Sequence, residues 1–231
     1  MDSIIEVVRC FENSNIIHVD GVINPTNDIE IIELELIYAD LETVMKRRER
    51  VKKQLKADKS LAKEDLVLEK IEKALNEGKS ARSVELIEEE KEIIKSLSLL
   101  TLKPLMYVAN VDEETIQNPE SNENFKKVKQ YAESQNAKVI PICVKLEEEI
   151  SSIESEEERK EFLEMMGLDK SGLDKLIIAS YDILGLMSYL TVRRNRSKSM
   201  DDKKGDKSSK SGIKDTFRYR KRVYKSGNRI I

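Results

Sequence analysis

The residues best suited to binding chemistry lie at positions 110–113, where the sequence reads Asn-Val-Asp-Glu after an apolar run. The side-chain amide of Asn110 offers donors and an acceptor, which is what the edge of a purine base requires of a protein. The carboxylate of Glu113 adds acceptors three residues later. An asparagine followed by acids is also a common turn or helix cap, so that alternative stays open.

The apolar run before Asn110 places this element at the end of a strand. No polar side chain interrupts residues 105–109, as in a strand that is buried on both faces of a parallel sheet. Pro104 can begin such a strand because its missing N–H costs little there. Asn110 then lies at the carboxyl end, which is where open α/β sheets bind their ligands.

Two further strands and the helix between them complete the predicted sheet. Residues 3–9 and 138–143 have the pattern of short buried strands, and residues 120–135 have an apolar face at helical spacing. The order strand, helix, strand predicts a right-handed parallel unit. Acidic helices are expected within 146–166, and an amphipathic helix begins near Ser171. The predicted fold class is α/β, a parallel sheet with flanking helices.

Residues 28–98 interrupt this pattern with a long, highly charged helical insertion. A helix is expected from Ile29 to about Leu55, and residues 57–60 form a short reversal. A second helix ends at Gly78, a natural C-cap, and a third piece follows over about 83–100. We therefore predict an antiparallel, coiled-coil-like helical arm inserted into a sheet domain made of residues 1–27 and 99–191.

The composition restricts the class of protein. Of 231 residues, 39% are apolar and 37% charged, and no apolar stretch approaches the roughly 20 residues of a membrane span, so a membrane partner is not expected. The sequence after Met1 lacks the basic and apolar regions of a signal peptide. Cys10 and Cys143 follow no metal-binding spacing, which favours a reducing, cytoplasmic location. A single histidine, His18, argues against a Ser-His-Asp triad or a histidine-bound metal.

Charge is divided unequally along the chain. Residues 192–231 carry 15 Lys and Arg against 4 Asp and Glu, a net charge of +11, whereas residues 1–191 carry a net charge of −14. The basic tail has few apolar residues to bury, so we expect it to be disordered. Any RNA binding by such a tail would be non-specific and would weaken steeply with salt, and no specific DNA binding is expected.

Several short motifs together resemble the YchF, or Obg-like ATPase, family of Obg-related P-loop proteins in the translation-factor class. The resemblance covers roughly residues 2–191. Its motifs are Val7-Val8-Arg9-Cys10-Phe11-Glu12, Asn15-Ile16-Ile17-His18-Val19, Asp28-Ile29-Glu30, Leu99-Leu100-Thr101-Leu102-Lys103-Pro104, Ala109-Asn110-Val111 and Leu173-Asp174-Lys175. The resemblance implies a G domain with an inserted helical arm, binding of ATP and more weakly of GTP, slow hydrolysis with Mg²⁺, and association with the ribosome.

The resemblance also implies roles for individual residues. The NKxD element that reads guanine in ordinary GTPases is NxxE here: Asn110 would hydrogen-bond adenine, Val111 would contact it through backbone and side chain, and Glu113 would mark the relaxed specificity. Phe11 would pack either on the base or in the core. Cys143 and Val144 would belong to the last nucleotide-binding loop. No catalytic residue is assigned.

Two features differ from the family pattern. No GxxxxGK[ST] phosphate loop occurs in the sequence, and phosphoryl transfer depends on that loop and on the Mg²⁺ that it helps to hold. We therefore expect an N-terminally truncated gene product that does not hydrolyse ATP alone and that exposes a sheet edge near residues 3–9.

The second difference is the tail, where the family has a small β-grasp module called TGS. Under one permitted choice of codons, shifted forward by one base, residues 194–202 read Glu-Thr-Glu-Val-Arg-Ala-Trp-Thr. Residues 216–228 then read His-Ser-Asp-Ile-Glu-Lys-Gly-Phe-Ile-Arg-Ala-Glu. Both resemble TGS sequences, so we hypothesise a frameshift near residue 191, which the codons of the gene will confirm or refute.

Two other functions remain compatible with the sequence. The chain can be a non-catalytic module whose helical arm and basic tail contact the ribosome or RNA, or a stand-alone coiled-coil adaptor. Nucleotide binding distinguishes a fragment of a YchF-type ATPase from both of these alternatives.

Overall fold

The computed structural model describes residues 2–12, 23–193 and 196–203. The chain divides into two compact units, residues 1–176 and 177–231. The family motif at residues 15–19 lies outside the described residues.

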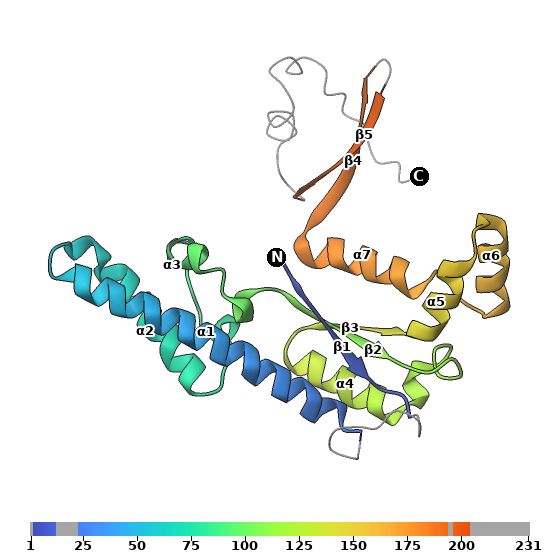
Figure 1. The fold of residues 1–231 in the computed structure, drawn as a ribbon, viewed down its shortest axis with the longest axis horizontal. Coiled ribbons are helices and arrows are strands. Elements are labelled where there is room, and N and C mark those ends of the chain that lie inside the picture. The colour runs from blue at the N-terminus through green and yellow to red at the C-terminus, as the bar shows by residue number, and fades with distance from the viewer. Residues whose placement is uncertain (1, 13–22, 194–195, 204–231) are drawn as a thin grey trace. The chain divides into compact units, whose positions relative to one another are not determined.

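The first unit is built on a parallel sheet of three strands in the order β1-β2-β3 (Figure 1). The strands are β1 (Ile4–Arg9), β2 (Leu105–Asn110) and β3 (Lys138–Ile142). All five residues from 105 to 109 are buried, so the prediction of a central strand covered on both faces is confirmed. The carboxyl ends of all three strands meet at one edge because the strands are parallel.

Helix α4 (Glu123–Ser134) connects β2 to β3 and covers one face of the sheet. Its buried Phe125, Val128 and Ala132 pack in the same cluster as Tyr107 of β2. The helix begins three residues later than expected because residues 119–121 form a separate 3-10 turn after Pro119. Three helices follow β3: α5 (Val144–Ser152), α6 (Glu156–Met165) and α7 (Gly172–Leu184).

The helical arm contains α1 (Pro25–Leu55), α2 (Ala62–Asn76) and α3 (Glu88–Ile94). Its buried side chains form a second core, separate from that of the sheet, which includes Ile37, Val44, Val51, Val67, Leu68, Ile71, Leu75 and Ile94. Gly78 has φ +73°, as its predicted role at the end of α2 requires. The expected third helix is shorter because Ser98, with φ +51°, interrupts it between two 3-10 turns.

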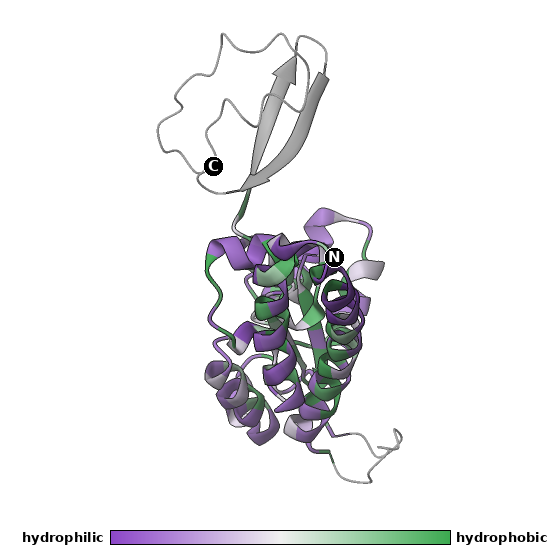
Figure 2. Ribbon diagram, turned by 90° about the vertical axis from the view of Figure 1, so that its left-hand side faces the viewer, coloured by the Kyte–Doolittle hydropathy of each residue, from purple (hydrophilic) through white to green (hydrophobic). Residues whose placement is uncertain are grey.

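Charged side chains join the two long helices of the arm. The guanidinium of Arg48 on α1 lies 3.2 Å from Asp65, 2.6 Å from Glu69 and 2.9 Å from Glu72, all on α2. Hydrogen bonding to these carboxylates raises the pKa of Arg48 above its usual value. Hydrophilic residues otherwise predominate along the outer faces of the helices (Figure 2).

A buried carboxylate attaches the arm to the segment that leads into β2. Asp40 on α1 is 3% exposed and accepts hydrogen bonds from the backbone N–H groups of Leu100 (2.8 Å) and Thr101 (2.7 Å). The Thr101 hydroxyl donates to the same carboxylate at 2.6 Å and accepts from the N–H of Ala81 at 3.0 Å. One side chain thus holds both the outgoing and the returning parts of the arm.

Two further carboxyl groups, those of Glu6 on β1 and Glu33 on α1, lie where the sheet meets the arm. Glu6 is opposite Tyr107 in the strand register, and Glu33 of α1 accepts hydrogen bonds from the hydroxyls of Tyr107 (3.3 Å) and Tyr131 (2.7 Å). Burial, with a smaller contribution from the charge of Glu33, raises the pKa of Glu6 to about 7, and Arg82 opposes this shift.

The second unit contains an antiparallel hairpin of β4 (Leu186–Arg193) and β5 (Arg196–Lys203). We expected residues 192–231 to be disordered. In the structure, residues 192–193 and 196–203 instead form parts of these two strands. Backbone pairing with β4 satisfies the N–H and C=O groups of the β5 segment. Residues 204–231 lie outside the described part.

Among the described residues, no helix combines the length and the apolar character needed to cross a membrane.

Replacing Asp40 by asparagine should lower the free energy of unfolding by about 2–3 kcal/mol, because an NH₂ group would then face backbone N–H donors in a buried place. Urea unfolding followed by circular dichroism measures this loss. The matched control is Glu42→Gln on the exposed side of α1, which should change stability by less than about 0.5 kcal/mol. Equal effects of the two substitutions would show that Asp40 has no special role.

The raised pKa of Glu6 predicts that stability falls as pH rises from about 4.5 to about 7. Over this range the folded protein retains a proton that the unfolded chain releases, so raising the pH favours unfolding. Glu6→Gln should remove this part of the slope and be more stable than the parent at pH 8. Urea midpoints at pH 5 and pH 8 provide the test, with the exposed Glu12→Gln as control. A variant with an unchanged slope would contradict the prediction.

Candidate functional site

The carboxyl edge of the sheet is held together by backbone hydrogen bonds between neighbouring strand ends. The N–H of Cys10, after β1, donates to the carbonyl of Asn110 at 2.8 Å. The N–H of Val111, after β2, donates to the carbonyl of Ile142 at 2.9 Å. The three strand ends therefore form one continuous rim on which side chains from distant parts of the sequence meet.

Asn110 lies at the centre of this rim and is half-buried. Its Oδ1 accepts a hydrogen bond of 3.2 Å from the N–H of Val144, the first residue of α5. This contact brings together two of the residues that the sequence assigned to one site. The Nδ2 donor of Asn110 has no partner in the part of the chain that the structure describes, so it is available to a ligand.

Val111 does not fit the role expected for its side chain. It is 2% exposed and packs in the sheet core with Val8 and Phe125, so its side chain cannot contact a base. A valine here continues the apolar pattern of β2 by one residue and is drawn into the core. Only its backbone carbonyl remains for a ligand at the rim.

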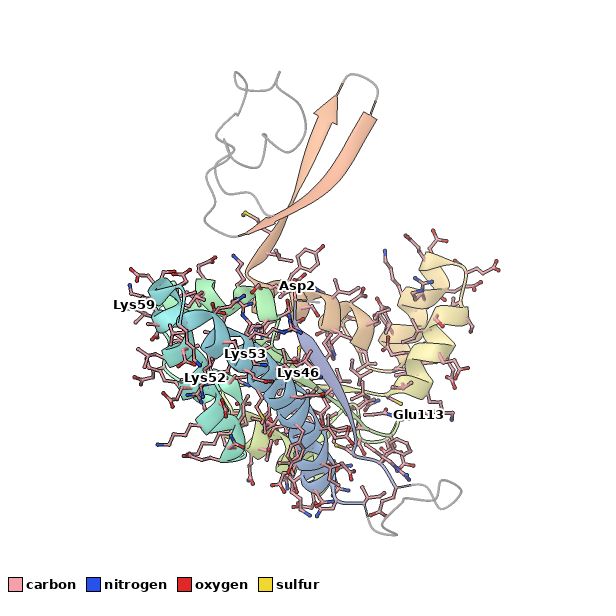
Figure 3. All side chains as sticks on the ribbon, turned by 60° about the vertical axis from the view of Figure 1, so that its left-hand side comes forward. Asp2, Lys46, Lys52, Lys53, Lys59 and Glu113 are labelled. Carbon is pink, nitrogen blue, oxygen red and sulfur yellow. The ribbon has the colours of Figure 1, made fainter. Side chains whose placement is uncertain are left out.

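The two acids after Val111 have different surroundings. Asp112 accepts hydrogen bonds from both the N–H (2.8 Å) and the hydroxyl of Thr115, which is the turn that the sequence left open as an alternative. Glu113, which is labelled in Figure 3, instead forms an ion pair with Lys145 of α5 at 2.6 Å. A hydrogen bond to Glu113 raises the pKa of Lys145. The sequence analysis did not assign Lys145 to the site.

Phe11 lies just beyond the end of β1 and is half-buried. The guanidinium of Arg9 is 4.9 Å from the centre of the Phe11 ring, and its Nε donates to the Phe11 carbonyl at 3.2 Å. Phe11 is therefore neither a fully buried core residue nor an open stacking platform, because a cation covers one face of its ring.

The two cysteines also lie at strand ends, and both are buried. Burial raises the pKa of Cys10 to about 12 and raises that of Cys143 above its usual value. Since the thiolate is the nucleophile and the metal ligand, neither thiol is suited to those roles at neutral pH. Val144, by contrast, is 49% exposed at the rim. No group of three potential metal-ligating side chains occurs among the described residues.

Asn122 is a positioning residue that the sequence analysis missed. Its Nδ2 donates to the carbonyl of Cys10 at 2.9 Å, and its Oδ1 accepts from the N–H of Phe125 at 3.0 Å. It therefore caps α4 while fixing the segment after β1. An asparagine just before an amphipathic helix was the available signal, because asparagine is a favoured N-cap.

Close packing at Gly172 holds α7 against the end of the sheet. The carboxylate of Glu147, on α5, accepts from the N–H groups of Gly172 (2.6 Å) and Leu173 (3.1 Å). A Cβ at position 172 would lie 2.9 Å from both Glu147 Oε1 and Ile142 Cγ2. Only glycine allows this approach without moving the carboxylate or the strand end.

The parallel sheet, its polar carboxyl rim and the inserted helical arm define an α/β protein of the G-domain class. The solved structure of the Schizosaccharomyces pombe YchF GTPase matches with a TM-score of 0.79 and 32% sequence identity, over 93% of this chain and 58% of that one. No protein-family model matches the chain.

Sequence comparison identifies the branch within that class. The chain is 48% identical over 208 residues to the ribosome-binding ATPase YchF of Bacillus subtilis, covering 90% of this chain and 57% of that protein. It is 43% identical over 192 residues to YchF of Escherichia coli O157:H7, covering 83% and 52%. The chain belongs to the YchF, or Obg-like ATPase, family and spans about half the length of the curated relatives it matches.

Gly172→Ala should lower the free energy of unfolding by about 1–3 kcal/mol, because the new methyl group displaces Glu147 from the N–H groups at the start of α7. Chemical denaturation measures the loss. Gly78→Ala provides a contrast, since nothing lies within 4 Å of its Cβ position and only its left-handed backbone conformation opposes the change, at a cost of about 1 kcal/mol. A stable Gly172→Ala protein would show that the carboxylate moves away easily.

Proposed function

We propose that this chain supplies the base-recognition part of a purine-nucleotide site in a ribosome-associated protein of the ATPase type. The observation that carries the proposal is the geometry of Asn110. The N–H of Val144 donates to its Oδ1 at 3.2 Å, which leaves Nδ2 without a partner among the described residues. An amide N–H donor at that place suits a ring nitrogen of adenine.

The ion pair of Glu113 supports a preference for adenine over guanine. In GTPases that carry the NKxD element, the aspartate accepts hydrogen bonds from the N1–H and the exocyclic amine of guanine. Here Glu113 has a longer side chain, and Lys145 lies 2.6 Å from its carboxylate. An acceptor already engaged by a cation is a poorer partner for guanine, and adenine has no N1–H to satisfy. We therefore propose ATP as the preferred ligand, with GTP bound more weakly.

The proposal extends to base recognition and not to hydrolysis. No GxxxxGK[ST] motif occurs among the 231 residues, so no residue of this chain is assigned to the phosphates. The described residues contain no cluster that fits Mg²⁺, and no step of a reaction is assigned to that ion.

The Bacillus subtilis and Escherichia coli relatives are ribosome-binding ATPases, which supports the proposed partner. A ribosome-associated role also supports a cytoplasmic location. The alternative function is a non-catalytic module whose arm contacts the ribosome or its RNA. One observation favours it: residues 46–63, at the end of the helical arm, carry nine Lys and Arg against two Asp and Glu.

Asn110→Asp tests the base site with little disturbance of the fold. The aspartate retains an acceptor for the N–H of Val144 but loses the amide donor, and it places a negative charge next to the electron-rich ring nitrogens of the base. Titration with fluorescent ATP should give weak binding by the parent chain and a loss of about tenfold or more in the variant, the equivalent of one hydrogen bond.

Asn118→Asp is the charge-matched control, because Asn118 is exposed and no site role is assigned to it. Fluorescent GTP should bind more weakly than ATP. Equal affinity of the parent and Asn110→Asp for ATP, or no binding by the parent at any accessible concentration, would contradict the proposed site.

A further inference from the structure

Five polar side chains meet inside the first unit where the sheet joins the arm, and none of them belongs to the proposed base site. They are Glu6 of β1, Glu33 of α1, Tyr107 of β2, Tyr131 of α4 and Arg82 of the 3-10 turn that follows α2. Helix α1 contacts both β1 and α4, which brings these side chains together (Figure 1). The other four are the titratable or charged groups that interact with Glu6 in the described part of the chain.

Within this cluster, Glu33 has a donor for each of its carboxylate oxygens. The hydroxyl of Tyr107 donates to Oε1 at 3.3 Å, and that of Tyr131 donates to Oε2 at 2.7 Å. Burial, with a further contribution from Glu33, raises the pKa of both tyrosines, so their hydroxyls stay protonated and remain donors. An arrangement in which both oxygens accept suits an ionised carboxylate. Glu33 is therefore the negatively charged member of the cluster.

Glu6 has no such donor for its Oε2. It lies opposite Tyr107 in the strand register, and this oxygen is buried without a hydrogen-bond partner among the described residues. An ionised carboxylate in this place would lose its hydration and would also be repelled by Glu33. The same two causes raise the pKa of Glu6 to about 7. The structure therefore has the arrangement expected of a protonated Glu6.

Arg82 is the cation that faces the two carboxyl groups. Its side chain lines a narrow crevice together with Glu33, and its charge opposes the rise in the pKa of Glu6. Its Nε is nevertheless buried without a hydrogen-bond partner, and no ion pair joins it to either acid in the part of the chain that the structure describes. A guanidinium stays charged at every pH at which a protein is folded. Because two tyrosines already occupy Glu33, Glu6 is the carboxyl group left for Arg82.

The backbone next to Arg82 is held in place, so a change of contact here involves the side chain alone. Ala81 is buried, and its N–H donates to the Thr101 hydroxyl at 3.0 Å. That hydroxyl in turn donates to Asp40 at 2.6 Å. Rotation about the side-chain bonds of Arg82 is therefore enough to bring its guanidinium to a neighbouring carboxylate, which it can bind through two parallel hydrogen bonds.

We propose that Glu6 and Arg82 form an ion pair between the sheet and the arm, which closes when Glu6 loses its proton and opens when Glu6 regains it. The structure has the open arrangement, in which the neutral carboxyl group and the guanidinium are unpaired. In the closed arrangement the proton has passed to solvent, and Arg82 neutralises a charge that would otherwise be buried without a partner. The pair responds to pH near neutrality and depends on neither nucleotide nor ribosome binding.

The test follows both side chains in the full chain by nuclear magnetic resonance, over a range from about pH 5 to pH 9 that spans the ordinary and the raised values for a carboxyl group. Selective ¹³C labelling of glutamate reports the carboxyl group of Glu6, and ¹⁵N labelling of arginine reports the Nε–H of Arg82. Glu6→Gln identifies the signal of Glu6 because it removes the carboxyl group with little change of shape. In the parent chain both signals should move with one midpoint at about pH 7. In Glu6→Gln the Arg82 signal should not move over this range.

Substitutions of Arg82 test the pairing from the other side. Arg82→Gln removes the proposed partner, so the pKa of Glu6 should rise by about 1 pH unit or more. Arg82→Lys retains the positive charge and should change that pKa by less than half as much. Arg50→Gln is the matched control, because it removes an exposed arginine of the same arm and should change the pKa of Glu6 by less than about 0.2 pH units in salt.

Three results would overturn the proposal. A pKa of Glu6 near its ordinary value of 4.5 would show that the carboxyl group is ionised over the whole range. A titration of Glu6 that leaves the Nε–H of Arg82 unchanged would show that the two groups do not pair. Equal changes in Arg82→Gln and Arg50→Gln would show a general effect of net charge. The first two results come from the parent chain, so they decide the question even if an Arg82 variant fails to fold.

Discussion

The carboxylate of Asp40 constrains the whole first unit. About sixty residues separate it from Leu100 and Thr101, whose backbone N–H groups donate hydrogen bonds to it. Without that contact the returning segment of the arm would have to be placed by packing alone, and this segment leads directly into β2. The position of β2 determines where Asn110 emerges at the sheet edge. A buried carboxylate that accepts three hydrogen bonds thus sets the geometry of a rim that it does not contact.

At the rim itself, most polar groups serve the fold. Asp112 forms a turn, Asn122 joins a helix to a strand end, and Glu147 secures the start of α7. The amide nitrogen of Asn110 differs because its own oxygen accepts from Val144, while the donor has no partner among the residues that the structure describes. This combination of a rigidly held side chain and an unsatisfied donor is what a binding site requires, since little conformational freedom is lost when a ligand arrives.

Local patterns were enough to predict the three strands, the long helical insertion and the glycine at the end of α2. The family resemblance, and not a local pattern, assigned Val144 to the same site as Asn110, and the structure brings the two residues into contact at one edge of the sheet. The Glu113–Lys145 ion pair and the bridging role of Asn122 depend on how loops from different strands meet, which no periodicity encodes. The β4–β5 hairpin was missed because β5 has almost no apolar residues and is a strand only through its pairing with β4.

Helix α1 belongs to both hydrophobic cores. Ile29, near its beginning, packs with the sheet, whereas Ile37, Val44 and Val51 pack in the arm. The helix runs unbroken for 31 residues, a length of about 46 Å at 1.5 Å per residue. It is therefore one continuous helix shared by the two cores, and Asp40 joins its middle to the segment that leads into β2. A macromolecule that contacts the arm would thus contact an element that also packs against the sheet.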